Sequence, residues 1–175
     1  MFRDINSVVQ EDLDFIASSS LNWSDLSGKT LLITGGGGLL ASYLAKALIT
    51  ASQLHNLQLK IICLARGMKS INKRLHSFIK YPDLRVILHD VALPLPSSLP
   101  LVDYVIHSAS QASPKFYQVD PVGTILPNTA GNLHLLQHSK QNNARFLFFS
   151  SVNADDRKSE LDKLFSQLKN SENLA

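Results

Sequence analysis

Five short runs of apolar residues along the chain predict five buried β-strands. The runs lie at residues 31–33, 59–65, 84–88, 102–107 and 145–149. Continuous apolar runs of this length are typical of strands that are covered on both faces. Such strands belong to parallel sheets, in which helices connect one strand to the next.

A helical pattern of apolar residues follows the first, second and fourth of these runs, over about residues 39–52, 70–80 and 122–142. We expect their apolar contacts to come from Leu40, Leu44, Ala47 and Leu48 in the first helix and from Leu133, Leu135 and Leu136 in the last. Residues 108–121, rich in serine and proline, are expected to form a loop. The alternation predicts an α/β fold, a Rossmann-type doubly wound parallel sheet of about five strands with right-handed crossovers.

A glycine turn joins the first strand to the first helix, with the spacing Thr34-Gly35-x-x-Gly38-x-x-Ala41. A backbone without Cβ atoms adopts positive φ and lets a bulky anion approach closely. The free N–H groups of the following helix favour a phosphate at the same place. Strand, glycines and helix in this order predict a dinucleotide pyrophosphate site, and the alternative is a glycine-rich loop that merely turns the chain.

Three regions of different character divide the chain. Residues 1–28 form an N-terminal arm, whose short amphipathic helix is broken at Ser18 and which we expect to pack on the sheet. Residues 29–151 form the predicted NAD(P)-binding Rossmann domain. Residues 152–175 form a divergent helical tail with an apolar stripe at Leu161, Leu164, Phe165 and Leu168. A sixth strand is missing, so we predict a fold truncated before any substrate domain.

Composition and charge add few constraints. The 175 residues suffice for one domain with a core, and the net charge of +3 does not call for nucleic acid as a partner. Basic residues cluster in the middle of the chain, at Lys60, Arg66, Lys69, Lys73, Arg74, Lys80 and Arg85. This cluster is either solvated helix charge or an attraction for a phosphorylated ligand.

The cysteine content and the hydropathy of the chain indicate its cellular compartment. Cys63 is the only cysteine, so no internal disulfide is possible, and its apolar surroundings predict a buried structural thiol. No signal-peptide core precedes the first strand, and no run approaches the ~20 apolar residues that cross a bilayer. We expect a cytoplasmic protein that does not act at a membrane.

Three segments together resemble the NAD-dependent epimerase/dehydratase family of extended short-chain dehydrogenases/reductases. They are residues 34–41, residues 103–114 and residues 121–136. The Ala-Ser-Pro step at residues 112–114, Tyr117 and the order Asn128-Thr129-x-Gly131 look most like UDP-glucuronate decarboxylases and dTDP-glucose 4,6-dehydratases. The likeness covers about residues 26–151.

The resemblance implies a set of cofactor-binding positions. Those around the pyrophosphate are Gly35, Gly38, Leu39 and Leu40; the pair that holds adenine is Asp90 and Val91; the wall beside the nicotinamide-side ribose is Ser108, Ala109 and Ser110; and the asparagine that supports the active site is Asn128.

The resemblance also implies positions toward the substrate. Ser113, Lys115 and Tyr117 lie where the family's substrate loop runs, although an exposed loop without a ligand explains them almost as well. Ser151 matches the serine or threonine that hydrogen-bonds the sugar hydroxyl. The likeness stops immediately after Ser151.

The choice of cofactor is left open by Arg66. An acidic residue at the end of the second strand would bind both ribose hydroxyls and select NAD, but Arg66 occupies that place. Arginine pairs with a 2′-phosphate, which favours NADP. Stacking on adenine and simple exposure are the alternatives. The family resemblance favours NAD, and Arg66 alone favours NADP.

The catalytic chemistry is incomplete in this sequence. Family enzymes oxidise a sugar hydroxyl with a tyrosine and a lysine spaced Tyr-x-x-x-Lys. Four residues after the tyrosines at positions 43, 81, 104 and 117 stand alanine, arginine, serine and proline. The histidines lack partners at metal-ligand spacing, so we expect no metal site.

Three hypotheses follow. The first is the NAD(P)-binding portion of a nucleotide-sugar epimerase, dehydratase or decarboxylase, catalytically incomplete alone. The second is a non-catalytic NAD(P)-sensing or protein-interaction module, with the apolar stripe of the tail on a partner. The third is a poorly folded remnant. A missing sixth strand leaves a sheet edge exposed, which predicts a homodimer or aggregation unless the tail covers it.

Overall fold

The computed structural model describes residues 2–4, 6–111 and 113–150, and within them one parallel sheet organises the chain. Its strands are β1 (Thr30–Thr34), β2 (Lys60–Ala65), β3 (Leu84–Leu88), β4 (Tyr104–His107) and β5 (Arg145–Phe148). They lie in the order β3-β2-β1-β4-β5, and every pairing is parallel. The predicted Rossmann-type doubly wound α/β fold is confirmed.

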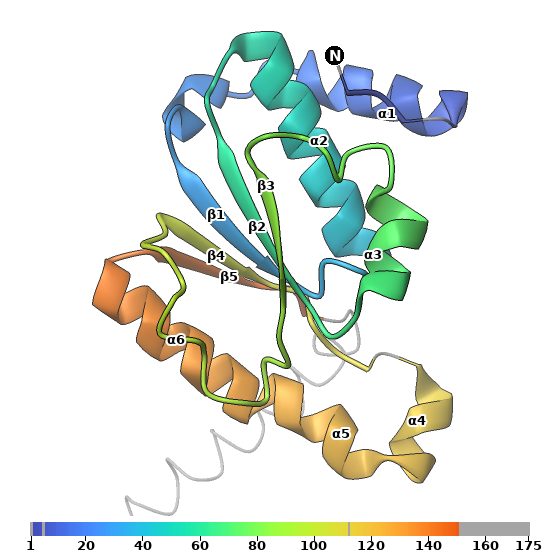
Figure 1. Cartoon of the computed structure of the whole chain (residues 1–175), viewed down its shortest axis with the longest axis vertical. Helices are drawn as coiled ribbons and strands as arrows, with labels where there is room; N and C mark the ends of the chain where they lie inside the picture. Colours follow the sequence, from blue (N-terminus) through green and yellow to red (C-terminus); the bar gives the residue numbers. More distant parts are fainter. Residues whose placement is uncertain (1, 5, 112, 151–175) are drawn as a thin grey trace, which may run out of the picture.

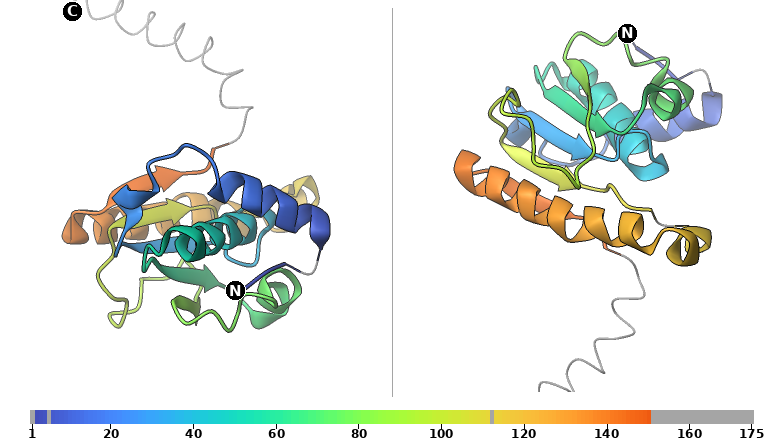
Figure 2. Two further views of the ribbon diagram at one scale, coloured as in Figure 1. Left: turned by 90° about the horizontal axis from the view of Figure 1, so that it is seen from above. Right: turned by 60° about the horizontal axis from the view of Figure 1, so that its bottom comes forward.

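Helices connect the strands and cover both faces of the sheet. They are α1 (Ser7–Ala17), η1 (Trp23–Leu26), α2 (Leu39–His55), α3 (Met68–Leu75), α4 (Pro114–Val119), α5 (Pro121–Ile125), η2 (Leu126–Asn128) and α6 (Ala130–Asn142). Figures 1 and 2 show α2 and α3 on one side of the sheet and α6 on the other. The sheet is therefore the middle of three layers.

The alternation of side chains along β1 divides the core into two clusters. Leu31 and Ile33 pack with α2, whereas Leu32 packs with Leu135 of α6 on the opposite face. All four side chains are buried. Because burying such a side chain contributes about 1.5–3 kcal/mol, both faces stabilise the sheet.

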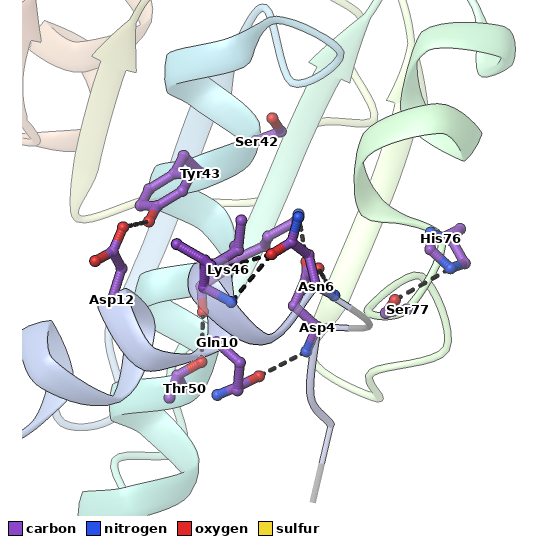
Figure 3. Close-up of polar contacts among 12 residues, drawn as sticks. Asp4, Asn6, Gln10, Asp12, Ser42, Tyr43, Lys46, Thr50, His76 and Ser77 are labelled. Carbon is purple, nitrogen blue, oxygen red and sulfur yellow. Dashed lines mark hydrogen bonds and ion pairs between the residues drawn. The ribbon is translucent and has the colours of Figure 1, made fainter.

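The N-terminal arm packs along α2 (Figure 1), and its buried Leu13 belongs to the same apolar cluster as Leu31 and Ile33 of β1. Asp4 forms a largely buried ion pair with Lys46 of α2, and its backbone N–H donates to the Gln10 side chain (Figure 3). Burial alone would raise the pKa of Asp4, but the Lys46 ammonium and the Asn6 N–H outweigh it and hold that pKa below its ordinary value. The arm is thus fixed by a paired charge.

The long helix predicted over residues 122–142 is wrong as one element, because the chain forms α5, η2 and α6 instead. Pro127 lies at the break. Proline has no backbone N–H and its ring clashes with the preceding turn, so a continuous helix cannot pass through it. The break brings the Pro127 carbonyl into the sheet layer, where it accepts a hydrogen bond from His107.

The loop predicted over residues 108–121 contains the short helix α4. Pro114 stands in its first turn, where its fixed φ suits a helix and its missing N–H costs nothing. The helix predicted over residues 70–80 begins earlier, at Met68, and ends at Leu75. Turns follow it.

Some predicted core positions face solvent instead. Leu40 is 61% exposed, and Leu133 and Leu136 are also exposed, whereas Leu135 is fully buried. Leu135 is the only one of the three helix leucines that points at the sheet, because helix residues adjacent in sequence diverge by about 100°. At the far edge of the sheet, β5 exposes Leu147 and Phe148.

In the part of the chain that the structure describes, no helix has the length and apolar character needed to cross a membrane.

Candidate functional site

A cavity opens at the carboxyl ends of the strands, where the order of the chain reverses. β1 pairs with β2 on one side and with β4 on the other, so connections leave this point in opposite directions. In doubly wound sheets a ligand binds at such a switch point. The cavity measures about 280 Å³. Its principal lining comes from Gly35, Gly37 and Gly38, from Arg66, Gly67 and Ser70, from Asp90 and Val91, from Ser108, Ala109 and Ser110, and from Pro127.

The turn after β1 requires glycine at position 35. Gly35 has φ of 72°, in the left-handed region, and a Cβ there would lie 3.0 Å from the Ala109 Cα and from the Ser108 carbonyl oxygen. Both neighbours are backbone atoms and cannot turn aside. The turn is closed by the Gly38 N–H, which donates to the Gly35 carbonyl at 2.7 Å. The predicted glycine turn therefore lies directly against the segment that follows β4.

The amino end of α2 follows this turn without a side chain in the way. Its N-cap is Gly38, which offers no side-chain acceptor to the first-turn N–H groups. The side chains of Leu39 and Leu40 are 62% and 61% exposed and do not line the cavity. Only their backbone is available to a ligand at the turn. Unpaired N–H groups and the helix dipole at this end favour an anion.

A buried network that the sequence did not reveal joins the ends of β1 and β4. The Thr34 hydroxyl oxygen accepts from the N–H groups of Ser108 and Ala109, each at 3.1 Å. Thr34 also lies 2.7 Å from Nδ1 of His107, whose Nε2 lies 2.9 Å from the Pro127 carbonyl oxygen. The carbonyl can only accept, so Nε2 carries the proton and Nδ1 accepts from the Thr34 hydroxyl.

The His107 imidazole is held neutral in this network. Burial lowers the pKa of His107 below its ordinary value, and the hydrogen bond to Pro127 opposes that shift. A proton on Nδ1 would face the Thr34 oxygen, which already accepts two N–H groups. The neutral ring thus fixes the walls of the cavity relative to one another.

This burial predicts a pH dependence of stability. The folded-state pKa of His107 lies below that of the unfolded chain, so the unfolded chain binds more protons under acid conditions. The free energy of unfolding should fall as pH drops below about 6.5. His107→Gln keeps a donor for the Pro127 carbonyl but does not titrate. The difference in bound protons between the unfolded and folded states, which sets this slope, should therefore be smaller by up to one proton in the variant.

Urea unfolding at several pH values measures that slope. His138, whose pKa burial also lowers, continues to titrate in the variant and supplies the residual slope. Equal slopes in the variant and in the unmodified chain would contradict a buried neutral His107.

Asp90 and Val91 reach the cavity from the segment after β3. The Asp90 carboxylate accepts from the Ala92 N–H at 3.0 Å, which fixes the turn and leaves its other oxygen for a ligand. Gly131 of α6 lies against Val91, where a Cβ would approach the Val91 carbonyl to 3.1 Å. The close approach packs α6 against this segment.

Asn128 lies behind the cavity wall and not in its lining. Its side-chain amide donates to the Ser110 hydroxyl at 3.2 Å and to the Thr124 carbonyl at 2.8 Å. Asn128 therefore contacts the cavity lining through Ser110 and does not line the cavity itself.

The residues predicted for the substrate side are not brought into the cavity. Ser113 precedes α4 as its N-cap, and Tyr117 is 51% exposed; neither lines the cavity. The side chain of Lys115 and the whole of Ser151 lie outside the described residues, as does the predicted tail of residues 152–175.

Several lining residues were not predicted, above all Gly67, Ser70, His89 and Pro127, whereas Gly37 was predicted as part of the glycine turn. Gly67 and Ser70 follow β2 and stand at the beginning of α3, so their place after a predicted strand was the available signal. Pro127 signalled a helix break but not its place in the cavity wall, which follows from the position of η2 in the folded chain.

The chemistry of the lining fits an elongated anion better than a metal ion. It offers glycine backbone, the amino end of a helix, hydroxyls and one arginine, which together suit phosphate groups. No group of three histidine, cysteine, aspartate or glutamate side chains that could hold a metal ion occurs among the residues that the structure describes. Cys63 is buried beneath the turn, and burial raises its pKa to about 12, so its thiol stays protonated.

Comparison with protein families gives a match over most of the chain. The family described as "NAD dependent epimerase/dehydratase family" matches residues 31–170. The matched part begins in β1 and includes every strand of the sheet.

Curated relatives include UDP-glucuronic acid decarboxylases from plants and animals. UDP-glucuronic acid decarboxylase 5 of Arabidopsis thaliana is 34% identical over 125 residues, which cover 71% of this chain and 34% of that protein. UDP-glucuronic acid decarboxylase 1 of Danio rerio is 30% identical over 128 residues, 73% of this chain and 28% of that protein. The chain spans about a third of the length of these relatives.

Solved structures share the fold at low identity. The dTDP-glucose 4,6-dehydratase DesIV of Streptomyces venezuelae, described with NAD and TYD bound, has a TM-score of 0.56 at 21% identity, over 66% of this chain and 37% of that one. A D-mannonate oxidoreductase-like protein of Haemophilus influenza, with bound NAD, has a TM-score of 0.58 at 20% identity, over 75% of this chain and 59% of that one.

Proposed function

Because the chain belongs to the NAD-dependent epimerase/dehydratase family, we propose that it binds a nicotinamide adenine dinucleotide in the cavity at the β1/β4 switch point. The family resemblance seen in the sequence is confirmed by the match over residues 31–170. The proposal rests above all on one observation, the Gly35–Gly38 turn that opens onto the uncapped amino end of α2.

Each part of the proposed ligand has residues of suitable chemistry. The pyrophosphate is assigned to the glycine turn and to the backbone of Leu39 and Leu40, where N–H groups and the helix dipole favour negative charge. The adenine is assigned to Asp90 and Val91, because the second Asp90 oxygen accepts from an exocyclic amine.

The nicotinamide end is assigned to the segment after β4. Ser108, Ala109 and Ser110 form the cavity wall there, and Asn128 holds Ser110 in place. The bound dinucleotide would supply a hydride acceptor at this wall. The chain's own contribution is to orient that end and to shield it from water.

The class of substrate is proposed from the relatives. Those described above are named for UDP-glucuronic acid and dTDP-glucose, which are nucleotide sugars. We assign this chain to the same substrate class as the cofactor-binding portion of such an enzyme. None of its four tyrosines is followed by lysine four residues later, so we propose that the chain alone does not oxidise a sugar.

Calorimetric titration of the chain with a dinucleotide tests this function. We expect saturable 1:1 binding, competition by ADP, which carries the adenine and pyrophosphate groups, and no competition by CMP. Bound ligand should also raise the melting temperature in proportion to the logarithm of its concentration.

A second measurement separates binding from turnover. UDP-glucuronate added to the chain with dinucleotide should release no carbon dioxide and remain unchanged. A folded chain that binds neither NAD nor NADP at millimolar concentration would refute the proposed function, and conversion of UDP-glucuronate would refute the proposed lack of turnover.

A further inference from the structure

The segment after β2 carries positive charge where a dinucleotide's adenosine ribose would lie. Arg66 and Gly67 follow β2 directly, and both line the cavity together with Ser70. Arg66 is exposed, and among the described residues its guanidinium makes no hydrogen bond or ion pair. It is therefore available to a ligand.

The first turn of α3 lies against the glycine turn. A Cβ on Gly37 would stand 2.1 Å from the Ser70 hydroxyl oxygen and 2.6 Å from its Cβ, so only glycine permits this approach. The Gly36 N–H donates to the Leu64 carbonyl of β2 at 2.9 Å and ties the two segments together. The Arg66–Ser70 segment is thus adjacent to the proposed pyrophosphate position.

Among the described residues, no carboxylate lines the cavity beside Arg66. The only acidic residue in the described lining is Asp90, which comes after β3 and makes no ion pair with Arg66. Helix α3, with the sequence MKSINKRL, has three basic residues and no acidic one. A free 2′-hydroxyl of NAD would find no anionic acceptor here, whereas a phosphate would find the Arg66 guanidinium.

We infer that this chain prefers a dinucleotide with a phosphate on the adenosine 2′-oxygen, and that Arg66 is the residue that selects it. The inference rests on the proposed function, since it concerns the same cavity. A phosphomonoester has nearly two negative charges and three acceptor oxygens, which match the donors and charge of the planar guanidinium. Stacking of Arg66 on adenine, the competing role, would serve NAD and NADP equally.

Parallel titrations with NADP and NAD test the selection. We expect the unmodified chain to bind NADP about tenfold or more tightly than NAD, because a hydrogen-bonded ion pair to phosphate contributes about 1.5–3 kcal/mol. Arg66→Ala should weaken the binding of NADP by about tenfold to a hundredfold and leave the affinity for NAD nearly unchanged. Arg66→Asp should in addition strengthen NAD, because its carboxylate accepts from the ribose hydroxyls.

Arg85→Ala is the matched control. Arg85 is also an exposed arginine, but it lies in β3 and does not line the cavity, so both affinities should stay as they are. Melting temperatures verify that every variant is folded. Added salt should weaken NADP more steeply than NAD in the unmodified chain only.

The outcomes separate this inference from the proposed function. If NAD binds as tightly as NADP or more tightly, the inferred selection for phosphate is wrong, but the proposed dinucleotide site is unaffected. An equal loss of both ligands in Arg66→Ala assigns Arg66 to adenine and overturns the selection as well. Absence of binding to either ligand by the folded chain overturns the proposed function, and this inference with it.

Discussion

Replacing Thr34 with valine is expected to lower the free energy of unfolding by about 3–5 kcal/mol, although the two side chains have nearly the same shape. The Thr34 hydroxyl serves the N–H groups of Ser108 and Ala109 and the Nδ1 of His107. Valine leaves all three without this partner; Thr34 and His107 are fully buried and the other two residues are half-buried, and each such group costs about 1–3 kcal/mol. Urea unfolding measures the loss.

Thr34→Ser is the control for this substitution. It keeps the hydroxyl and removes one methyl group, so we expect a loss of only about 1 kcal/mol. Because the network holds the wall formed by Ser108 and Ala109, valine should also weaken dinucleotide binding and serine should not. Equal stability of the two variants would show that the hydroxyl does not join β1 to β4.

The sheet was predictable because its strands are local patterns. The run at residues 84–88 forms the observed β3. The glycine spacing after residue 34 predicts the turn, because glycine tolerates the positive φ that Gly35 adopts. Apolar runs and glycines report conformations that the chain adopts over a few residues. The fold class follows from their order alone.

The features that were missed depend on contacts between distant parts of the chain. His107 lies 73 residues from Thr34, and nothing in the neighbourhood of either predicts a hydrogen bond between them. The break at Pro127 could be predicted, since proline interrupts a helix. The hydrogen bond between the Pro127 carbonyl and His107 could not. A pattern in sequence shows where a turn occurs, and the tertiary fold decides what it contacts.

The inference about Arg66 depends on both the sequence and the tertiary fold. The sequence alone predicts that Arg66 follows a strand and that it bears on the choice between NAD and NADP. The structure adds the neighbours that bear on this choice: Ser70 beside the glycine turn, an α3 without acidic residues, and Asp90 on a different segment. Charge near a ligand is a property of the surroundings, and one residue does not determine it.

Gly35→Ala is expected to lower the free energy of unfolding by about 2–4 kcal/mol and to abolish detectable dinucleotide binding. Alanine is strained at φ of 72°, and its Cβ meets backbone atoms of Ser108 and Ala109 at 3.0 Å. The turn must open to relieve this contact, which displaces the N–H groups at the start of α2. Urea unfolding and calorimetric titration measure the two effects.

Gly28→Ala separates backbone strain from contact. Gly28 has nearly the same φ, 68°, but a Cβ there meets nothing within 4 Å. Its loss should be about 1 kcal/mol, and dinucleotide affinity should not change. The difference between the two variants measures what the contact between the glycine turn and the segment after β4 contributes. If both lose equal stability and Gly35→Ala still binds the dinucleotide, that contact does not shape the site.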